Sequence, residues 1–307
     1  MPAKHPKVAV LLAAFNGIQW IEEQLDSILG QSGVDITVHI SVDPSNDGTE
    51  AWCLAYAARH SCVSVLPYAG IFGGASRNFF RLIRDAALDD VEYVAFADQD
   101  DIWNPDKLER AIRQIKNRNV DAYSSNVIAF WPDARRHLLN KAQPQAAWDF
   151  LFEAAGPGCT YVLTRDLVNS LKASMLASWN EVQSVSLHDW YCYAFARSHG
   201  FKWFIDPRPS MNYRQHERNQ VGANTGIGSL VSRYRTIHDG WWFSQVRLIA
   251  RLNGLEHDSF VRQWLSLRRW QLLKLSFKAW HCRRRVRDKL FFFCICWAAA
   301  LIGSQVR

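Results

Sequence analysis

The first part of the chain alternates between continuous apolar runs and helix-like spacings. The run Lys7–Phe15 (KVAVLLAAF) lacks the polar alternation of a half-exposed strand, so it predicts a central strand buried on both faces. After Asn16-Gly17, apolar residues recur at helical spacing from Ile18 to Leu29. The same patterns predict further strands at 36–42, 63–67 and 91–97, and helices at 50–60, 76–87 and 107–117. Strands and helices that alternate with short links favour an α/β fold with an open, mostly parallel sheet flanked by helices.

Beyond residue 117 the pattern is less regular. It predicts strands at 123–130, 161–164 and 201–205, a helix from 186 to about 199, and a loose surface stretch at 131–147. Residues 102–105 and 156–160 have the composition of turns, and 211–224 form a polar segment with one aromatic residue.

Three carboxylates, Asp98, Asp100 and Asp101, directly follow the predicted strand at 91–97. Carboxylates grouped at a strand's end repel one another unless a cation or hydrogen-bond donors offset their charge. Mg²⁺ or Mn²⁺ suits such oxygen ligands and typically shares its coordination shell with phosphates. Because ligands of open α/β sheets bind beyond the carboxyl ends of the strands, we expect Asn16, Asp43 and Asp98 to lie near each other. The alternative is an acidic turn that only caps the following helix.

The composition supports a substantial core, since 49% of the 307 residues are hydrophobic and 14 are Trp. The length allows one large domain or one domain with an appendage. The seven cysteines are odd in number and lack zinc-site spacing, which indicates reduced, cytosolic thiols. The basic N-terminus leads straight into a strand, so we expect no secretory signal.

The charge is divided unevenly along the chain. Residues 227–307 contain 15 Lys/Arg and 4 Asp/Glu, whereas residues 1–226 contain 21 and 25, so the net charges are +11 and −4. An acidic body with a basic tail does not resemble a uniformly nucleic-acid-binding surface, and we expect no nucleic-acid partner.

An ordered set of short motifs resembles a known family. The set comprises Ala13–Gly17 (AAFNG), Val42-Asp43 before Asn46–Thr49 (NDGT), Asp98–Asp101 (DQDD), His188–Trp190 (HDW) and Tyr213–His216 (YRQH). Together they resemble the inverting nucleotide-sugar glycosyltransferases of family two, which have the GT-A fold. The nearest likeness is to bacterial rhamnosyltransferase-like enzymes of cell-surface polysaccharide assembly, and it covers roughly residues 7–225. The sequence departs from the family at 43–47 (DPSND), where relatives usually have a denser Asp-Asp-Gly-Ser run.

The resemblance implies a role for each motif. A nucleoside diphosphate sugar, either a dTDP- or a UDP-sugar such as dTDP-rhamnose, would be the donor, and a glycan or lipid-linked saccharide the acceptor. Asp189 would be the base that takes the proton of the acceptor hydroxyl. Donor-binding residues would be Phe15, Asn16, Asp43, Arg77, Asn78, Asp98 and Gln99. Acceptor-side residues would be Gly158, Cys159, Thr160, His188 and Trp190. Metal ligands for Mg²⁺ or Mn²⁺ would be Asp98, Asp100 and His216.

Several of these residues also have a purely structural interpretation. Asp189 stands where an ordinary helix N-cap would stand. Asn16 can serve turn geometry alone, and Arg77 and Asn78 can form a solvated helix start. His216 can be a surface-loop histidine, and Cys159 a packing residue.

The resemblance divides the chain into a catalytic domain at 1–226, with a nucleotide-sugar half (1–120) and an acceptor half (121–226), and a helical, basic and aromatic C-terminal extension at 227–307. In this extension Arg283–Lys289 precedes the apolar run Leu290–Gly303, whose 14 residues are fewer than the ~20 that span a bilayer. Basic and aromatic residues together suit an anionic membrane surface, so we expect a cytoplasmic protein bound peripherally to the inner face of the cell membrane. The alternative is a helix packed on the catalytic domain with solvated arginines.

Two other functions remain open from the sequence. A sugar nucleotidyltransferase would have a Gly-rich, basic loop after the first strand, and Phe15–Gln19 (FNGIQ) is not such a loop. A non-catalytic sugar-nucleotide-binding protein is disfavoured by the presence of Asp98, Asp100 and Asp189.

Overall fold

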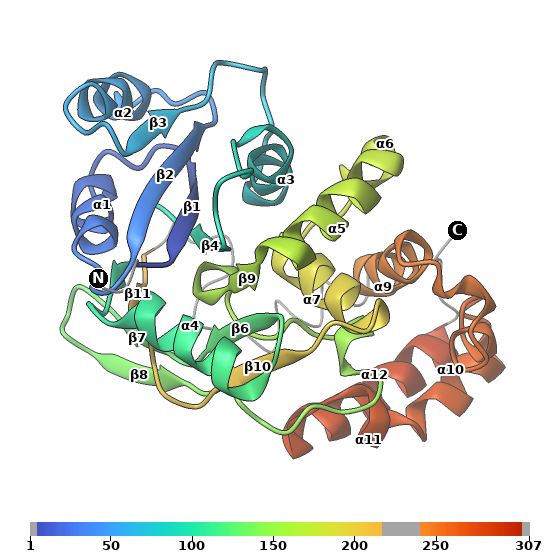
Figure 1. Ribbon diagram of the computed structural model, residues 1–307. Coiled ribbons are helices and arrows are strands. Elements are labelled where there is room, and N and C mark those ends of the chain that lie inside the picture. The colour runs from blue at the N-terminus through green and yellow to red at the C-terminus, as the bar shows by residue number, and fades with distance from the viewer. Residues whose placement is uncertain (1–4, 217–239, 303–307) are drawn as a thin grey trace.

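The computed structural model describes residues 5–216 and 240–302 and has a seven-stranded sheet at its centre (Figure 1). In spatial order the strands are β10 (Trp203–Asp206), β6 (Ala122–Ser125), β9 (Val162–Thr164), β4 (Tyr93–Ala97), β1 (Lys7–Ala14), β2 (Asp35–Val42) and β3 (Val63–Val65). Within this sheet β9 pairs antiparallel with β4 and β6, and the other neighbours are parallel. The predicted α/β fold with a mostly parallel sheet is therefore confirmed.

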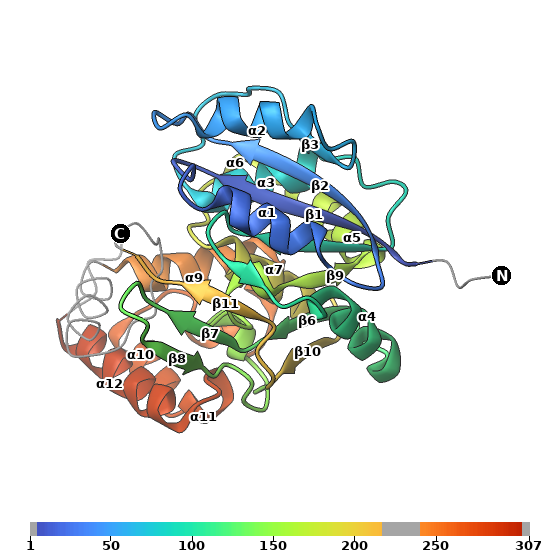
Figure 2. The same ribbon diagram turned by 90° about the vertical axis from the view of Figure 1, so that its left-hand side faces the viewer.

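Helices cover both faces of this sheet, as Figures 1 and 2 show. The period of two along β1 sends Val8 and Val10 to one face and Ala9 and Leu11 to the other, and all four are fully buried. One face packs against α1 (Ile21–Leu29), α2 (Thr49–Ala57) and α4 (Lys107–Arg118). The other packs against α3 (Ala75–Asp85), α5 (Arg165–Ala177), the short α6 (Trp179–Val182) and α7 (His188–Ser198). The continuous apolar runs of the sequence are thus the strands that lie between two helical layers.

A smaller four-stranded sheet corrects four sequence predictions, and one of them is the polar segment at 211–224, whose first four residues form a strand. Its order is β5 (Ile102–Trp103), β11 (Met211–Arg214), β7 (Val127–Phe130) and β8 (Arg136–Leu139). The predicted turn at 102–105 thus contains a strand, the predicted surface stretch contains β8, and the single strand predicted at 123–130 is two. The break occurs at buried Asn126, whose side chain donates to the Pro207 carbonyl (2.7 Å) and accepts from the Lys141 amide (2.6 Å). These bonds satisfy backbone groups where the chain passes from one sheet to the other.

The described C-terminal helices pack on the catalytic body. They are α9 (Trp241–Leu252), α10 (Arg269–Ser276), α11 (Ala279–Cys282) and α12 (Val286–Ile302), joined by the 3₁₀ turns η3 (Leu255–His257) and η4 (Val261–Gln263). Their buried residues, among them Trp264 and Phe292, belong to the same core as α3 and α7. The alternative of a packed C-terminal region is therefore the one observed. Sequence features at 217–239, including the predicted boundary at 226, and residue 303 lie outside the described residues.

A buried ion pair ties this region to the body. Arg284 is almost fully buried and pairs with Asp149 (3.0 Å), which begins the 3₁₀ turn η1 (Asp149–Leu151). Asp149 also accepts from Tyr193 (2.9 Å) and pairs with Arg197 (3.1 Å). The expectation of solvated arginines is therefore wrong for Arg284, because its charge is neutralised inside the protein. Among the described residues, no helix has both the length and the apolar character required to cross a bilayer.

Candidate active site

A cleft of about 1550 Å³ opens beyond the carboxyl ends of β1, β2 and β4. Its walls continue onto the 3₁₀ turn η2 (Gly158–Thr160), the start of α7 and the N-terminal end of α12. One cavity therefore contains Asn16, Asp43 and Asp98, which were predicted from three separate strand ends, as expected for an open α/β sheet.

The carboxylates after β4 differ in their surroundings. Asp98 and Asp100 line the cleft, whereas Asp101 is fully buried and accepts a hydrogen bond from the Arg214 amide (3.1 Å). Burial and the neighbouring charge of Asp100 raise the pKa of Asp98 to about 7, and the same causes raise the pKa of Asp101 well above its usual range. The repulsion inferred from the sequence is thus present in the fold.

A buried lysine that the sequence interpretation missed lies beside these carboxylates. The ammonium of Lys107 donates to the Cys159 carbonyl (2.8 Å) and lies 3.0 Å from the centre of the Trp103 ring. Burial lowers the pKa of Lys107, and Cys159, Asp101 and Asp98 oppose that shift. The helical period of the sequence could have predicted the burial of Lys107, because this residue shares the buried face of α4 with Leu108 and Ala111.

The predicted metal ligands lie together in the cleft. Nε2 of His216 is 2.7 Å from an Oδ of Asp100, and the imidazole stacks on Trp20 with ring centroids 4.0 Å apart. Asp98 and Asp100 offer the carboxylate oxygens that Mg²⁺ and Mn²⁺ prefer, so the residues present fit such an ion. The thiol of Cys159 also lies close to Asp98 and Asp101, but burial raises its pKa, and a neutral thiol is a poor ligand for these ions. Trp20 carries no motif and was missed.

The side chain of Gln99 holds the loop after β1. It accepts from the Phe15 amide and donates to the Phe15 carbonyl, both at 2.8 Å. A Cβ on Gly17 would lie 2.1 Å from Oε1 of Gln99, so only glycine permits this approach. Asn16 has a φ of 48° and lines the cleft, so it serves the predicted turn geometry and can still face a ligand.

The other predicted donor-side residues divide into two groups. Asp43 lines the cleft, and its two carboxylate oxygens accept from the amides of Phe72 (2.9 Å) and Gly73 (2.8 Å). Asn78 also lines the cleft, where it donates to the Ser41 carbonyl (2.9 Å). Arg77 instead donates to the Gln183 carbonyl (2.9 Å) and is not among the described cleft-lining residues. The structure therefore brings Asp43 and Asn78 to the cleft and leaves Arg77 outside.

Asp189 lies in the first turn of α7 and lines the cleft. Burial raises the pKa of Asp189 to about 6, although Oδ1 accepts from the Trp190 amide (2.7 Å). The preceding His188 stacks on Phe79 with centroids 3.9 Å apart, and burial lowers the pKa of His188 to about 3. The cleft thus contains a carboxyl whose charge changes near neutral pH beside a neutral imidazole.

Gly158 makes this arrangement possible. A Cβ at this position would lie 2.6 Å from Nε2 of His188 and 3.1 Å from Cβ of Asp189. By contrast, Cys159 and Thr160 are buried, and Thr160 donates to the Pro157 carbonyl (2.7 Å). Gly158 and His188 therefore line the cleft as predicted, whereas Cys159 and Thr160 pack behind its wall.

Trp190 also lies in the core rather than in the cleft. Its indole N–H donates to the Phe150 carbonyl (3.0 Å), which fixes the ring among buried residues. The prediction of an acceptor contact at Trp190 reflects its place beside Asp189 in the sequence, but on a helix adjacent residues point in different directions.

Four cationic side chains line the end of the cleft that lies away from the strand termini. They are Lys141, Arg283, Arg285 and Arg287. The sequence interpretation assigned the three arginines to a membrane surface and gave Lys141 no role. The fold brings them to the cleft because η1 and the loop around residue 140 pack against the chain entering α12.

Comparisons with known proteins agree with this fold and site. Residues 9–169 match the model of Glycosyl transferase family 2. The dTDP-rhamnosyl transferase RfbG of Shigella flexneri is 43% identical over 281 residues, which cover 91% of this chain and 96% of that protein. The UDP-Glc:alpha-D-GlcNAc-diphosphoundecaprenol beta-1,3-glucosyltransferase WfgD of Escherichia coli is 26% identical over 165 residues, or 53% of this chain and 62% of that one.

Two solved structures are similar in fold. Residues 1–349 of S. aureus TarS have a TM-score of 0.57 at 13% identity, with 98% of this chain and 93% of that chain covered. The mannosyltransferase PcManGT from Pyrobaculum calidifontis has a TM-score of 0.51 at 14% identity, with coverages of 99% and 89%. The predicted GT-A fold is therefore confirmed. Because the family model spans more than half of the chain and RfbG is similar over nearly all of it, this protein belongs to glycosyl transferase family 2.

Proposed function

We propose that this protein transfers a rhamnosyl group from dTDP-rhamnose, with inversion at the anomeric carbon, to a glycan or lipid-linked acceptor in cell-surface polysaccharide assembly. The observation that carries the proposal is the placement of Asp189 in one cleft with the carboxylates Asp98 and Asp100. The choice of donor is supported by the similarity to a relative named as a dTDP-rhamnosyl transferase.

Asp189 acts as the general base. A base works best when its pKa lies near the pH of the reaction, and burial raises the pKa of Asp189 toward this range. The carboxylate takes the proton of an acceptor hydroxyl while the oxygen attacks the anomeric carbon and the bond to the diphosphate breaks. A single displacement of this kind inverts the anomeric centre, whereas retention would require a carboxylate nucleophile close to the sugar.

The donor occupies the end of the cleft formed by the strand termini. Asp43, which lines the cleft, accepts from the pyrimidine base in this proposal, and Phe15, Asn16 and Gln99 contribute to the same lining. Asp98, Asp100 and His216 would hold Mg²⁺ or Mn²⁺, whose charge would neutralise the departing diphosphate. The structure of PcManGT, which is similar in fold, contains GDP-Man and Mn²⁺.

A donor screen tests the proposal. The protein is incubated with dTDP-rhamnose, UDP-glucose, UDP-GlcNAc or GDP-mannose, with Mg²⁺ or Mn²⁺ and with chelator, in the presence of lipid-linked saccharides. We expect nucleoside diphosphate release from dTDP-rhamnose, dependent on the ion. A parallel incubation contains a nucleoside triphosphate and a sugar phosphate. Release of inorganic diphosphate in this incubation would instead identify a nucleotidyltransferase. Tight donor binding without turnover on any acceptor would favour a non-catalytic binding protein.

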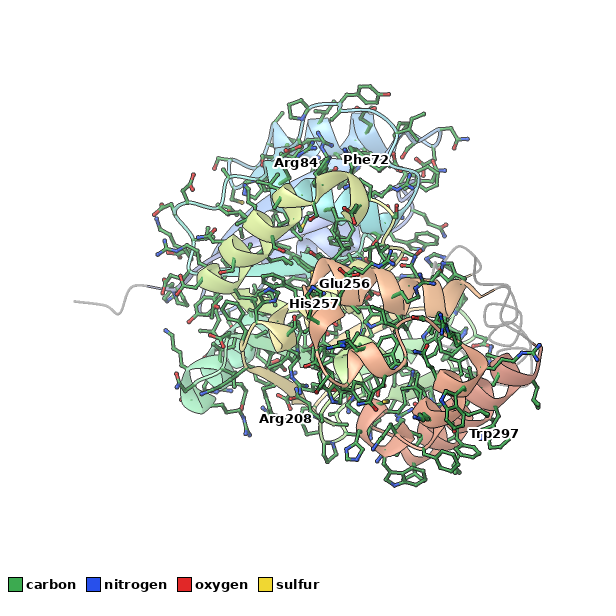
Figure 3. All side chains as sticks on the ribbon, turned by 90° about the vertical axis from the view of Figure 1, so that its right-hand side faces the viewer. Phe72, Arg84, Arg208, Glu256, His257 and Trp297 are labelled. Carbon is green, nitrogen blue, oxygen red and sulfur yellow. The ribbon has the colours of Figure 1, made fainter. Side chains whose placement is uncertain are left out.

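The proposed enzyme acts at the inner face of the cell membrane, from the cytoplasm. Support comes from an aromatic patch on α10–α12, which comprises the exposed Trp270, Phe277, Trp280 and Trp297 and the half-buried Phe293 (Trp297 is labelled in Figure 3). Trp270, Phe277 and Trp280 are 63%, 70% and 55% exposed. Lys274 lies over the Trp270 ring and Lys289 over the Trp280 ring. Aromatic rings beside lysines suit the interface of an anionic bilayer.

A further inference from the structure

The cleft has opposite charges at its two ends. Asp43, Asp47, Asp98 and Asp100 line the end formed by the strand termini. Among the described residues, all the Lys and Arg side chains that line the cleft belong to one cluster at the other end, here called the acceptor-end cluster: Lys141, Arg283, Arg285 and Arg287. Glu153 and Asp288 are the acidic residues within this part of the lining, so the cluster has an excess of two positive charges.

Lys141 is the member of the cluster whose charge acts on Asp189. Lys141 is half-buried, and in the described part of the chain no hydrogen bond or ion pair engages its ammonium. Burial lowers the pKa of Lys141 to about 8, and its positive charge lowers the pKa of Asp189. A lysine without a protein partner beside the general base leaves its hydrogen-bond donors for a ligand.

The arginines are held in place around Lys141. Arg283 donates to the Phe152 carbonyl (2.7 Å) and lies 3.8 Å from Glu153, and Arg285 donates to the Asn140 carbonyl. Arg287 is 72% exposed and contacts Asp288 at 3.3 Å. Arg283 also lies 3.9 Å from Asp288, so these contacts use one to three of the five N–H groups of each guanidinium, and donors remain for an anion.

The helix α12, which begins within the cluster, also favours the binding of an anion there. α12 begins at Val286, and the dipole of a 17-residue helix places partial positive charge at this end. Arginines here raise an already positive potential, which costs stability unless an anion occupies the site. Backbone amides at a helix N-terminus bind phosphate groups readily.

We propose that the acceptor-end cluster binds the phosphate or diphosphate ester of a prenyl-linked acceptor. The inference rests on the proposed function, and it specifies the acceptor. α12 leads from the cluster toward the aromatic patch, and Leu301, exposed on the same helix, lies 14 residues beyond Arg287, or about 21 Å along the axis. An acceptor whose phosphate lies at the cluster extends its prenyl chain along this helix toward the membrane and presents its sugar to Asp189.

Direct binding tests this assignment. Farnesyl diphosphate and its neutral counterpart farnesol are titrated into the protein, with dTDP and Mg²⁺ present at saturation so that the donor site is filled. We expect farnesyl diphosphate to bind at least tenfold more tightly than farnesol. The double variant Lys141→Gln/Arg287→Gln should weaken farnesyl diphosphate binding roughly ten- to hundred-fold, because two charge-assisted contacts are lost.

A matched control removes the same two charges elsewhere. Lys116 and Arg113 are exposed on α4, away from the cleft, and Lys116→Gln/Arg113→Gln should leave the affinity unchanged. Equal affinity in the wild type and the Lys141/Arg287 variant would overturn the inference, as would equal binding of the diphosphate and the alcohol.

A second arm separates a lipid-linked acceptor from a phospholipid headgroup. The wild type and the Lys141/Arg287 variant are sedimented with phosphatidylglycerol vesicles. We expect equal binding because the aromatic patch is intact in each protein. Loss of vesicle binding in the variant would assign the cluster to phospholipid headgroups and contradict the acceptor role. Because this test measures binding, its failure is distinct from that of the donor screen, in which no transfer from dTDP-rhamnose would be seen.

Discussion

The two ends of the cleft are built in different ways. The proposed donor end is acidic and consists of short motifs that follow strands, such as Asp98–Asp101 after β4. The proposed acceptor end is basic and combines Lys141 with arginines more than 140 residues further along the chain. The first arrangement is dictated by the sheet, because parallel strands end at a common edge. The second exists only because the C-terminal helices pack against η1. The proposed donor site therefore depends on the sheet, whereas the proposed acceptor site depends on long-range packing.

The largest effect on rate should come from the residue between the two ends. Asp189→Asn should lower turnover by about 10²–10⁴ and leave donor affinity nearly intact, because the amide cannot accept the acceptor's proton. Steady-state kinetics gives the turnover number, and calorimetry with dTDP on the same preparation gives the affinity for the donor nucleotide. Near-normal turnover in the folded variant would reduce Asp189 to a structural residue at the start of α7.

The long-range packing can be broken at one residue. Arg284→Met leaves the buried carboxylate of Asp149 without a full complement of partners, which should cost about 3–5 kcal/mol of unfolding free energy. Urea denaturation measures this loss. The exposed Arg113→Met serves as control and should change the stability by less than about 0.5 kcal/mol. Unchanged stability in Arg284→Met would mean that the C-terminal helices are an appendage and not part of the core.

The donor end should respond to a different change. Asp100→Ala should weaken dTDP binding about ten- to hundred-fold when Mn²⁺ is present and little when it is chelated, because a carboxylate ligand of the ion is lost. Calorimetry with and without the ion distinguishes the two conditions. Metal-dependent binding equal to that of the wild type would remove Asp100 from the site. The exposed Asp106→Ala is the control.

The pH dependence of the rate sharpens the assignment of the base. Burial raises the pKa of Asp189 to about 6, and the base must be ionised to accept a proton, so kcat should fall about tenfold per pH unit below pH 6 and level off above it. Lys141→Gln removes a positive charge that stabilises the carboxylate, so the midpoint of this profile should move to higher pH. A midpoint near pH 4, the ordinary value for Asp, would contradict a buried base.

The smallest effect is expected at the membrane. Replacing Trp270, Phe277 and Trp280 together by Ser should lower partition into anionic vesicles about tenfold, because each ring contributes apolar area at the interface. Co-sedimentation with anionic and neutral vesicles provides the measurement. Tyr68→Ser/Leu54→Ser, at exposed positions in the N-terminal half, should bind vesicles like the wild type. An equal loss in this control would argue against a specific patch.

Much of the donor end could be predicted from the sequence. Continuous apolar runs identified β1 and β4, since strands between two helical layers must be apolar on both faces. The turn residues after them located Asn16, Asp43 and Asp98, which do lie in one cleft. The position of a residue within a motif was a less reliable guide to the direction in which its side chain points. Arg77 and Trp190 stand beside cleft residues in the sequence, but their side chains bond to Gln183 and Phe150.

What the sequence alone determined was the order of strands and helices up to about residue 117, the strand ends that line the cleft, and the uneven charge of the chain. These features depend on local periodicity and composition, which are set by residues close together in the sequence. The tertiary structure decided the division of 123–130 between two sheets, the burial of Lys107 beside the carboxylates, and the direction of the C-terminal arginines. Arg284 enters the core, Arg283 and Arg287 line the cleft, and the adjoining helices expose their aromatic rings. Successive residues of one basic run thus have different surroundings because each surrounding is supplied by a distant segment, such as Asp149 for Arg284 and Asn140 for Arg285.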